Sequence, residues 1–480
     1  MPSYEAVIGL EVHVQARTQS KMFCSCANRF GAEPNTLVCP VCMGYPGVMP
    51  APNREAIRKI VTAGLMCSCD IQRKSKFDRK SYFYPDMPKN YQLTQYDMPF
   101  CLHGKVHISG TGFSGEELPD KDIRLTRIHL EEDVAKLTHF GTHSGVDFNR
   151  AGVPLMEIVS EPDMRSPDEA YAYLTSLKQI IQYADISDCD MEKGQMRCDV
   201  NISIRERGSE KFGTKVELKN LNSFRAVHRA IAYEMKRQIL ILSEGGTIEQ
   251  ETRGWNDDVG DSYSMRGKEN AHDYRYFPEP DLLPVEFTDA DIEEFKRHLP
   301  ELPSARRQRF IEQYQVTAYD AQVLTQEKPC ADYFEAAASR SQAPKLVANW
   351  IVGDLMRELS ESGHTFADCP LPPENLAEMV DLIHKGTING KIGKTVFPEM
   401  FTTGKKAADI IKEKGLVQVS DEGAILKFIE DAIAANPAQV QQYREGRKNV
   451  LQFFVGQVMK ASRGKANPQT VQKLLAEKLG

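Results

Sequence analysis

Hydrophobic and polar residues alternate along residues 7–16, VIGLEVHVQA. On an extended chain this alternation places four apolar residues on one face: Ile8, Leu10, Val12 and Val14. Glu11 and His13 lie on the opposite face. The pattern predicts a strand with one buried face. Because any polar residue satisfies a wet face, a carboxylate and an imidazole two positions apart are candidates for chemistry.

Three further segments repeat this alternation with charged residues on one face. Their polar faces hold Arg127, His129, Glu131 and Asp133 in the first, Arg197, Asp199, Asn201 and Ser203 in the second, and Lys215, Glu217 and Lys219 in the third. If the second and third strands form a hairpin, their polar faces coincide unless the register slips. Glu132 interrupts the apolar side of the first segment, and Glu157 lies inside the apolar run LMEIV.

Residues with a helical period of 3.6 form two groups. Within the strand-rich part, residues 166–184 open with the capping-box pattern SPDE, and residues 223–242 begin after Asn222 or Ser223; both segments predict helices. From about residue 289 onward amphipathic helical patterns dominate. We therefore expect an α+β fold with an all-α extension, divided into three domains at residues 1–292, 293–407 and 408–480.

Composition is consistent with several soluble domains. The chain has 480 residues, more than one hydrophobic core usually organises, with 41% hydrophobic and 26% charged residues. No apolar run reaches the roughly eighteen residues of a membrane span. The start, MPSYEAVIGL, has the features of neither a signal peptide nor a transit peptide, so we expect a cytoplasmic protein.

Charge is distributed unevenly. The net charge is −7, yet residues 444–480 carry +6, which leaves −13 for the rest of the chain. A basic tail on an acidic body favours a polyanionic partner that is contacted at one end. The alternative from charge alone is a solvated basic helix face.

Two glycine-rich segments resemble nucleotide-binding motifs without their context. GTGFSG, residues 110–115, is followed by EELPDKD instead of a helix, which favours a hairpin loop. GKIGKT, residues 390–395, lacks the first glycine of a P-loop, because Ile388 stands there, and it has no preceding strand. Any ATP site must therefore use another architecture.

Four cysteines form two close pairs separated by twelve residues: Cys24, Cys26, Cys39 and Cys42. Such pairs suit tetrahedral Zn²⁺, and a four-thiolate set leaves no open position, which predicts a structural site. Unconnected thiols or a redox pair are the alternatives. Cys67 and Cys69 could replace some of these ligands.

Carboxylates with an occasional imidazole, repeated on several strands, suit Mg²⁺ held together with substrate phosphates. A separate segment, FDRKSYFYPDMPKNYQ, interleaves Arg79, Lys80 and Lys89 with Tyr82 and other aromatic residues. Cations and aromatic rings in this arrangement could clamp a nucleotide or stack unpaired bases. They could equally form a loop packed by its own aromatic residues.

These segments closely resemble the B subunits of aspartyl/glutamyl-tRNA amidotransferases (GatB). The likeness is carried by VIGLEVHVQ, FDRKSYFYPDMPKNYQ, DFNRAGVPLMEIVSEPD, MRCDVNIS, GTKVELKNLNSF and DYRYFPEPDL, and it extends into the basic tail. It implies a large, mostly antiparallel cradle related to glutamine synthetase, then a helical domain and a YqeY-like, tRNA-binding tail. It also implies a heterotrimer with a glutaminase A subunit and a small C subunit.

The resemblance implies a ligase that uses ATP and Mg²⁺, with zinc in a structural role. The side-chain carboxylate of misacylated Glu-tRNA(Gln) or Asp-tRNA(Asn) would be phosphorylated and then amidated with ammonia from the A subunit. Carried over by motif, the Mg²⁺ ligands and catalytic residues would be Glu11, His13, Glu131 and Glu157, with Asp199, Glu217 and Lys219 lining the same cradle and Arg79, Lys80, Tyr82 and Lys89 binding ATP or substrate. Strand parity favours Glu131 as the ligand, whereas the misplacement of Glu132 on the apolar side favours Glu132.

A different class of function is a zinc-stabilised tRNA-binding scaffold whose partners perform all the chemistry. The chain has no nucleophile typical of glutaminases, since residue 2 is Pro and no G-x-S-x-G motif is present. Ammonia must then come from a partner in either case. The choice of tRNA is left open by the sequence.

Overall fold

The computed structural model describes residues 3–267, 273–416, 422–444, 449–462 and 468–479, together with Arg447 and Ala466. Two compact units divide the chain, at residues 1–302 and 303–480. No helix among the described residues is long and apolar enough to cross a membrane. Each unit has its own core.

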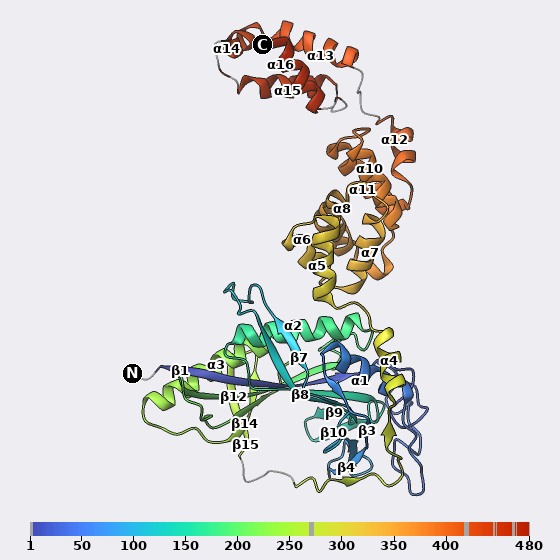
Figure 1. Cartoon of the computed structure of the whole chain (residues 1–480), viewed down its shortest axis with the longest axis vertical. Helices are drawn as coiled ribbons and strands as arrows, with labels where there is room; N and C mark the ends of the chain where they lie inside the picture. Colours follow the sequence, from blue (N-terminus) through green and yellow to red (C-terminus); the bar gives the residue numbers. More distant parts are fainter. Residues whose placement is uncertain are drawn as a thin grey trace. The chain divides into compact units, whose positions relative to one another are not determined.

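A large twisted sheet dominates the first unit (Figure 1). Its strands lie in the order β15 (Asp261–Gly267), β14 (Glu251–Asn256), β13 (Val216–Lys219), β12 (Met196–Glu206), β1 (Tyr4–Gln15), β11 (Pro154–Ser160), β8 (Lys121–Glu132), β6 (Cys101–Leu102) and β2 (Asp70–Ile71), while β7 (Lys105–Ile108) also pairs with β8. Among the described strands of this sheet, β13 and β14 are parallel and the other pairs are antiparallel. β1 therefore lies in the middle of the sheet, between β12 and β11.

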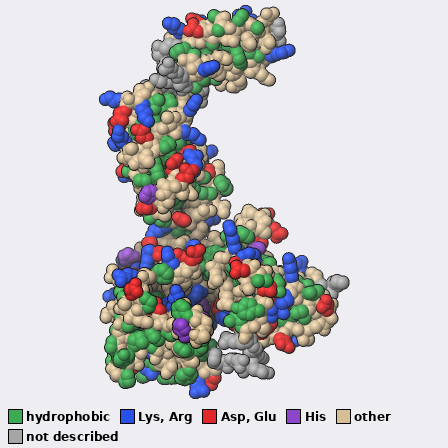
Figure 2. All heavy atoms as spheres, turned by 180° about the vertical axis from the view of Figure 1, so that it is seen from behind, with side chains coloured by type: hydrophobic (Ala, Val, Ile, Leu, Met, Phe, Trp, Pro, Cys, Tyr) green, Lys and Arg blue, Asp and Glu red, His purple; other side chains and the backbone are tan. Residues whose placement is uncertain are grey.

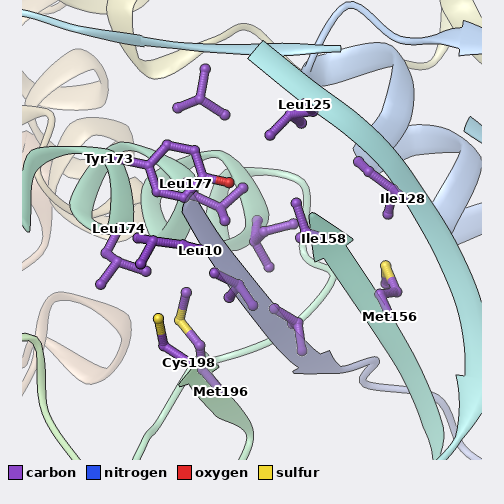
Figure 3. Packing of buried hydrophobic residues seen from close by; sticks show 14 of the residues in the cluster. Leu10, Leu125, Ile128, Met156, Ile158, Tyr173, Leu174, Leu177, Met196 and Cys198 are labelled. Carbon is purple, nitrogen blue, oxygen red and sulfur yellow. The ribbon is translucent and has the colours of Figure 1, made fainter. Parts of the chain in front are cut away.

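Three helices cover one face of this sheet: α1 (Arg54–Met66), α2 (Pro167–Tyr183) and α3 (Phe224–Ser243). Side chains of α2 pack on the apolar face of β1, β11 and β12 (Figure 3). Tyr173, Leu174 and Leu177 from the helix and Leu10 and Ile158 from the strands are fully or almost fully buried. This layer leaves the opposite, polar face of the sheet available for a site.

Smaller elements complete the first unit. They are a three-stranded sheet of β16 (Phe277–Pro278), β4 (Asp78–Ser81) and β5 (Tyr91–Thr94), two strand pairs, β9 (Lys136–Phe140) with β10 (His143–Asp147) and β3 (Lys74–Ser75) with β17 (Val285–Glu286), and the helix α4 (Asp289–Arg297). α4 packs against α1. The expected boundary between residues 292 and 293 falls inside this helix, and the division into three domains stays a prediction.

The second unit is entirely helical in its described part. Its helices are α5 (Pro303–Tyr314), α6 (Ala318–Leu324), α7 (Lys328–Ala338), α8 (Pro344–Trp350), α9 (Met356–Ser362), α10 (Pro373–His384), α11 (Gly390–Thr403), α12 (Ala407–Lys414), α13 (Glu422–Ala435), α14 (Pro437–Arg444), α15 (Val450–Ala461) and α16 (Pro468–Leu479). The last four share a small core that includes Ile425, Ile429, Phe454, Val458 and Leu475.

Local sequence patterns predict several elements correctly. Ser166 caps α2 and Ser223 caps α3, each accepting a hydrogen bond from a backbone N–H of the first turn. β12 and β13 form the expected hairpin, with Asn201 opposite Glu217 on the polar face. The GTGFSG segment lies in the loop between β7 and β8, and GKIGKT begins α11, so the α+β fold with a helical extension is confirmed.

Candidate active site and zinc cluster

One row of residues crosses four strands of the large sheet on its polar face. His13 on β1 is opposite Arg197 on β12 and Glu157 on β11, and Glu157 is opposite His129 on β8. Residues in register on neighbouring antiparallel strands point to the same face. Four segments distant in sequence therefore present these side chains together.

His13 and Glu157 of this row converge with Glu131, which lies two residues beyond His129 on β8. We call these three residues the acidic triad. One ligand atom of each lies within 4.8 Å of the others. His13 Nε2 is 3.4 Å from Glu157 Oε2 and 3.9 Å from Glu131 Oε1. The buried His129 lies beside them, with Nε2 3.6 Å from Glu157 and 3.8 Å from Glu131. The carboxylates thus face imidazoles rather than bulk water.

The charges of the triad stabilise one another. Burial alone would lower the pKa of His13, but its hydrogen bond to Glu157 and the charges of Glu131 and Glu157 raise it overall. Burial alone would raise the pKa of Glu157, and the neighbouring His129, His13 and Arg127 hold it well below its usual range. An anionic Glu157 is the form that a cation requires.

The donor set of the triad fits a hard divalent cation. Two carboxylates and one imidazole, with no thiol among them, are typical ligands of Mg²⁺ or Mn²⁺ bound together with substrate oxygens. Of the predicted ligands, His13, Glu131 and Glu157 are brought together. Glu11 lies two residues before His13 on β1, and its carboxylate accepts a hydrogen bond of 2.8 Å from Asn201.

A second charged group lies beside the triad on the same face. Asp199 is opposite Glu11, and Lys219 on β13 pairs with Asp199 and, at 3.1 Å, with Glu217. A cavity of about 230 Å³ continues along this face from Glu11 and is lined by Gly9, Glu11, Asn201, Phe212 and Lys215, among others. The polar face therefore combines anionic groups, a partnered lysine and an open volume.

The cation–aromatic segment lies on β4 and β5, where most of its cations already have acidic partners. Arg79 forms a two-pronged ion pair with Glu279, at 2.7 and 2.8 Å, and lies over the Tyr91 ring. Lys89 pairs with the buried Glu132. Glu132 is therefore held by Lys89, whereas Glu131 belongs to the triad, which favours Glu131 as the ligand.

Lys80 is the predicted cation whose charge reaches the triad. Burial alone would lower its pKa, but the carboxylates of Glu131 and Glu157 and the hydroxyls of Tyr274 and Tyr276 raise it overall. Its ammonium lies 4.7 Å from the centre of the Tyr274 ring. Tyr274 and Tyr276 lie in the segment DYRYFPEPDL, and no local pattern in the sequence indicates that this segment lines the site.

Tyr82 lies near the same small sheet, in contact with the Tyr84 ring at 6.2 Å between centroids. Burial and the nearby Asp86 raise the pKa of Tyr82 to about 12, so its hydroxyl stays protonated at neutral pH. No contact in the described residues joins Tyr82 to the triad. Its expected role in binding ATP or substrate stays a prediction.

The four expected zinc ligands converge in an irregular segment that precedes α1, which we call the cysteine lobe. One Sγ atom from each of Cys24, Cys26, Cys39 and Cys42 lies within 4.8 Å of the others. Lys21 is fully buried, with its ammonium 3.7 Å from Cys42 Sγ and donating to the Phe148 carbonyl at 3.2 Å. Four convergent thiols next to a buried positive charge fit a metal ion that binds thiolates.

Cys67 and Cys69 are outside this cluster. Burial raises the pKa of Cys67 well above its usual range and raises that of Cys69 to about 12, so both are neutral thiols. They lie in the main core together with Cys101. The geometry therefore favours the set of four over the alternative ligands.

Known proteins match this chain over its whole length. Residues 6–293 match the GatB/GatE catalytic domain, and residues 332–479 match the GatB domain. A relative from Carboxydothermus hydrogenoformans is 52% identical over 484 residues, covering 100% of this chain and 99% of its own, and one from Persephonella marina is 53% identical over 479 residues, covering 99% of each. Both relatives are named as the B subunits of aspartyl/glutamyl-tRNA(Asn/Gln) amidotransferases. The chain therefore belongs to this family of amidotransferase B subunits.

Proposed function

We propose that the polar face of the large sheet catalyses the ATP-dependent activation of the side-chain carboxylate of an amino acid that is esterified to tRNA. The substrates would be Glu-tRNA(Gln), Asp-tRNA(Asn) or both. Ammonia would come from an A subunit of the glutaminase type within a cytoplasmic heterotrimer that also contains a small C subunit. The sheet would then be a cradle of the glutamine synthetase type.

The reaction has two steps. A carboxylate oxygen of the aminoacyl side chain attacks the γ-phosphorus of ATP, the bond to the β–γ bridging oxygen breaks, and ADP leaves with its electron pair. The nitrogen lone pair of ammonia then attacks the acyl carbon, inorganic phosphate leaves, and a proton is lost to give the amide. A divalent cation bound at the triad would supply positive charge to the phosphates.

The acidic triad is the single observation that carries this proposal. A tRNA-binding scaffold has no use for two carboxylates and an imidazole converging within 4.8 Å on a sheet face that lies beside a cavity. The cavity begins at Glu11, two residues before His13 on β1, or about 7 Å along the strand. This distance suits a nucleotide whose terminal phosphate reaches the triad.

The test is a heterotrimer reconstituted with a glutaminase-inactive A subunit and supplied with ammonium, ATP and Glu-tRNA(Gln) or Asp-tRNA(Asn). We expect ADP to form in proportion to the amidated tRNA, and only when misacylated tRNA is present. Uncharged tRNA is the control. A complex that binds tRNA yet forms no ADP would leave the scaffold as the function of this chain.

The C-terminal helices are proposed to bind the tRNA backbone. Figure 2 shows Lys and Arg side chains at the surface of these helices, and the tail from residue 444 carries net charge +6, although Lys448, Arg463 and Lys465 lie outside the described residues. Contacts with phosphates release counterions, so binding weakens as salt rises.

Removal of residues 408–480 from the heterotrimer should weaken tRNA binding and flatten its salt dependence. Each lost phosphate contact removes roughly 0.7 to 0.9 from the slope of log K against log salt. Filter binding between 50 and 300 mM salt measures this slope. An unchanged slope would mean that the basic residues are merely solvated.

A further inference from the structure

The proposed phosphoryl transfer needs a cation that faces the triad and still has hydrogen-bond donors free for a phosphate. Lys80 lies over the Tyr274 ring, and most of the other cations of the polar face are already paired with acidic groups. Arg79 donates from Nε and Nη2 to Glu279, Lys89 pairs with Glu132, and Lys219 pairs with Asp199 and Glu217. Arg127 approaches Glu157 at 3.6 Å and donates to His129.

Arg197 differs from these cations. It lies directly opposite His13 in the row that crosses the sheet, and about a third of its side chain (36%) is exposed. Among its contacts with described residues, one Nη2 hydrogen bond of 3.0 Å reaches Asp133. A guanidinium has five N–H donors, so most of the donors of Arg197 remain available to a phosphate.

Asp133 holds Arg197 in this position. The carboxylate is almost fully buried and also accepts a hydrogen bond of 2.7 Å from Gln15, while Arg150 lies 3.7 Å away. Burial alone would raise the pKa of Asp133, but the positive charges of Arg197 and Arg150 and the bond from Gln15 outweigh this effect and lower it overall. An anchored carboxylate of this kind fixes the direction of the guanidinium before substrate arrives.

We propose that Arg197, held by Asp133, binds the γ-phosphoryl group of ATP and stabilises it during transfer to the side-chain carboxylate of the aminoacyl-tRNA. This proposal rests on the proposed function and assigns a residue to it. As the bond between the γ-phosphorus and the bridging oxygen breaks, the new bond to the carboxylate forms and negative charge spreads over the equatorial phosphoryl oxygens. The free N–H groups of Arg197 would donate hydrogen bonds to these oxygens. No proton is gained or lost in this step. Asp133 is then a positioning residue.

The test replaces Arg197 with Ala and with Lys in the full heterotrimer. For Arg197→Ala we expect kcat for ADP formation to fall by about 10² to 10³-fold at saturating ATP, as for the loss of one preorganised donor to a transition state. Arg197→Lys keeps the charge without the fork and should lose about tenfold. Added methylguanidinium should restore part of the activity of Arg197→Ala, because it can occupy the vacated volume and donate in the same place.

The matched control is Arg205→Met on the same strand. Arg205 pairs with Glu5 at 2.6 Å and lies eight residues away, or about 26 Å along β12, on the same face of the sheet. Its kcat should stay within twofold of that of the unaltered complex. The thermal unfolding midpoint of each variant shows whether it folds, and Arg197→Lys provides the test if Arg197→Ala does not.

The outcomes separate this proposal from the proposed function. An unaltered complex that forms no ADP would overturn both. If the unaltered complex is active, three results would each overturn the role of Arg197 only. The first is a kcat of Arg197→Ala within threefold of that of the unaltered complex. The others are a change in the KM for ATP alone, or a loss of kcat that methylguanidinium does not relieve. A fall in kcat with chemical rescue would support it.

Discussion

Replacing Glu157 with Gln should lower the rate of ADP formation by about 10² to 10³-fold, the range seen when one preorganised electrostatic group is lost from an active site. Glu157 contacts His13 of the triad at 3.4 Å and the neighbouring His129 at 3.6 Å. Gln keeps the size of the side chain but removes the negative charge that a divalent cation needs. The measurement is ADP release by the heterotrimer with misacylated tRNA and ammonium.

The control is Glu5→Gln, which alters a glutamate on the neighbouring strand β1 that lies on the same face and pairs with Arg205. It should keep nearly full activity. Binding of tRNA should be the same in both variants, because neither residue is in the C-terminal helices. Full activity of Glu157→Gln would refute the assignment of the site.

If the four cysteines bind zinc, as the sequence predicts, removing the metal should unfold the cysteine lobe locally. The lobe around the four cysteines has little regular secondary structure, and structural zinc sites in small peptides contribute roughly 10 to 16 kcal/mol of folding free energy. Without a metal, only protein contacts would hold the four sulfur atoms together next to the buried Lys21. We expect backbone amides of residues 24–42 to exchange at least about a hundredfold faster after treatment with a chelator or in Cys39→Ser.

Hydrogen exchange with mass spectrometry measures this effect, and zinc content by elemental analysis accompanies it. Cys369→Ser, which changes a cysteine of the second unit, should keep both zinc content and exchange unchanged. If the metal-free protein exchanged like the untreated one, the four cysteines would be ordinary thiols.

Much of this architecture follows from local sequence patterns. A period of two residues is enough to assign Glu11 and His13 to the face opposite Leu10, and this parity is what the structure has. Helix starts follow from Ser166 and Ser223, since capping depends on neighbours along the chain. Four strands with the same polar parity then indicate a shared polar face.

Other features depend on which strands are neighbours in the sheet. The alternation of residues along one strand does not give that information. Asp133 and Arg197 are 64 residues apart, and their pairing needs the order β12, β1, β11, β8. The choice between Glu131 and Glu132 depends on Lys89, which lies beside a different sheet. For the same reason Arg79 and Lys89 look like free cations in the sequence, whereas the fold gives each an acidic partner.

The central place of β1 has a consequence for how this protein can change. Adding or deleting one residue within this strand would turn Leu10 and Val12 toward water and carry Glu11 and His13 into the apolar layer. Pairing on both edges of the strand would be affected at once. A changed side chain in this segment can leave the rest of the strand in place, whereas a changed length would displace the proposed site residues and the core together.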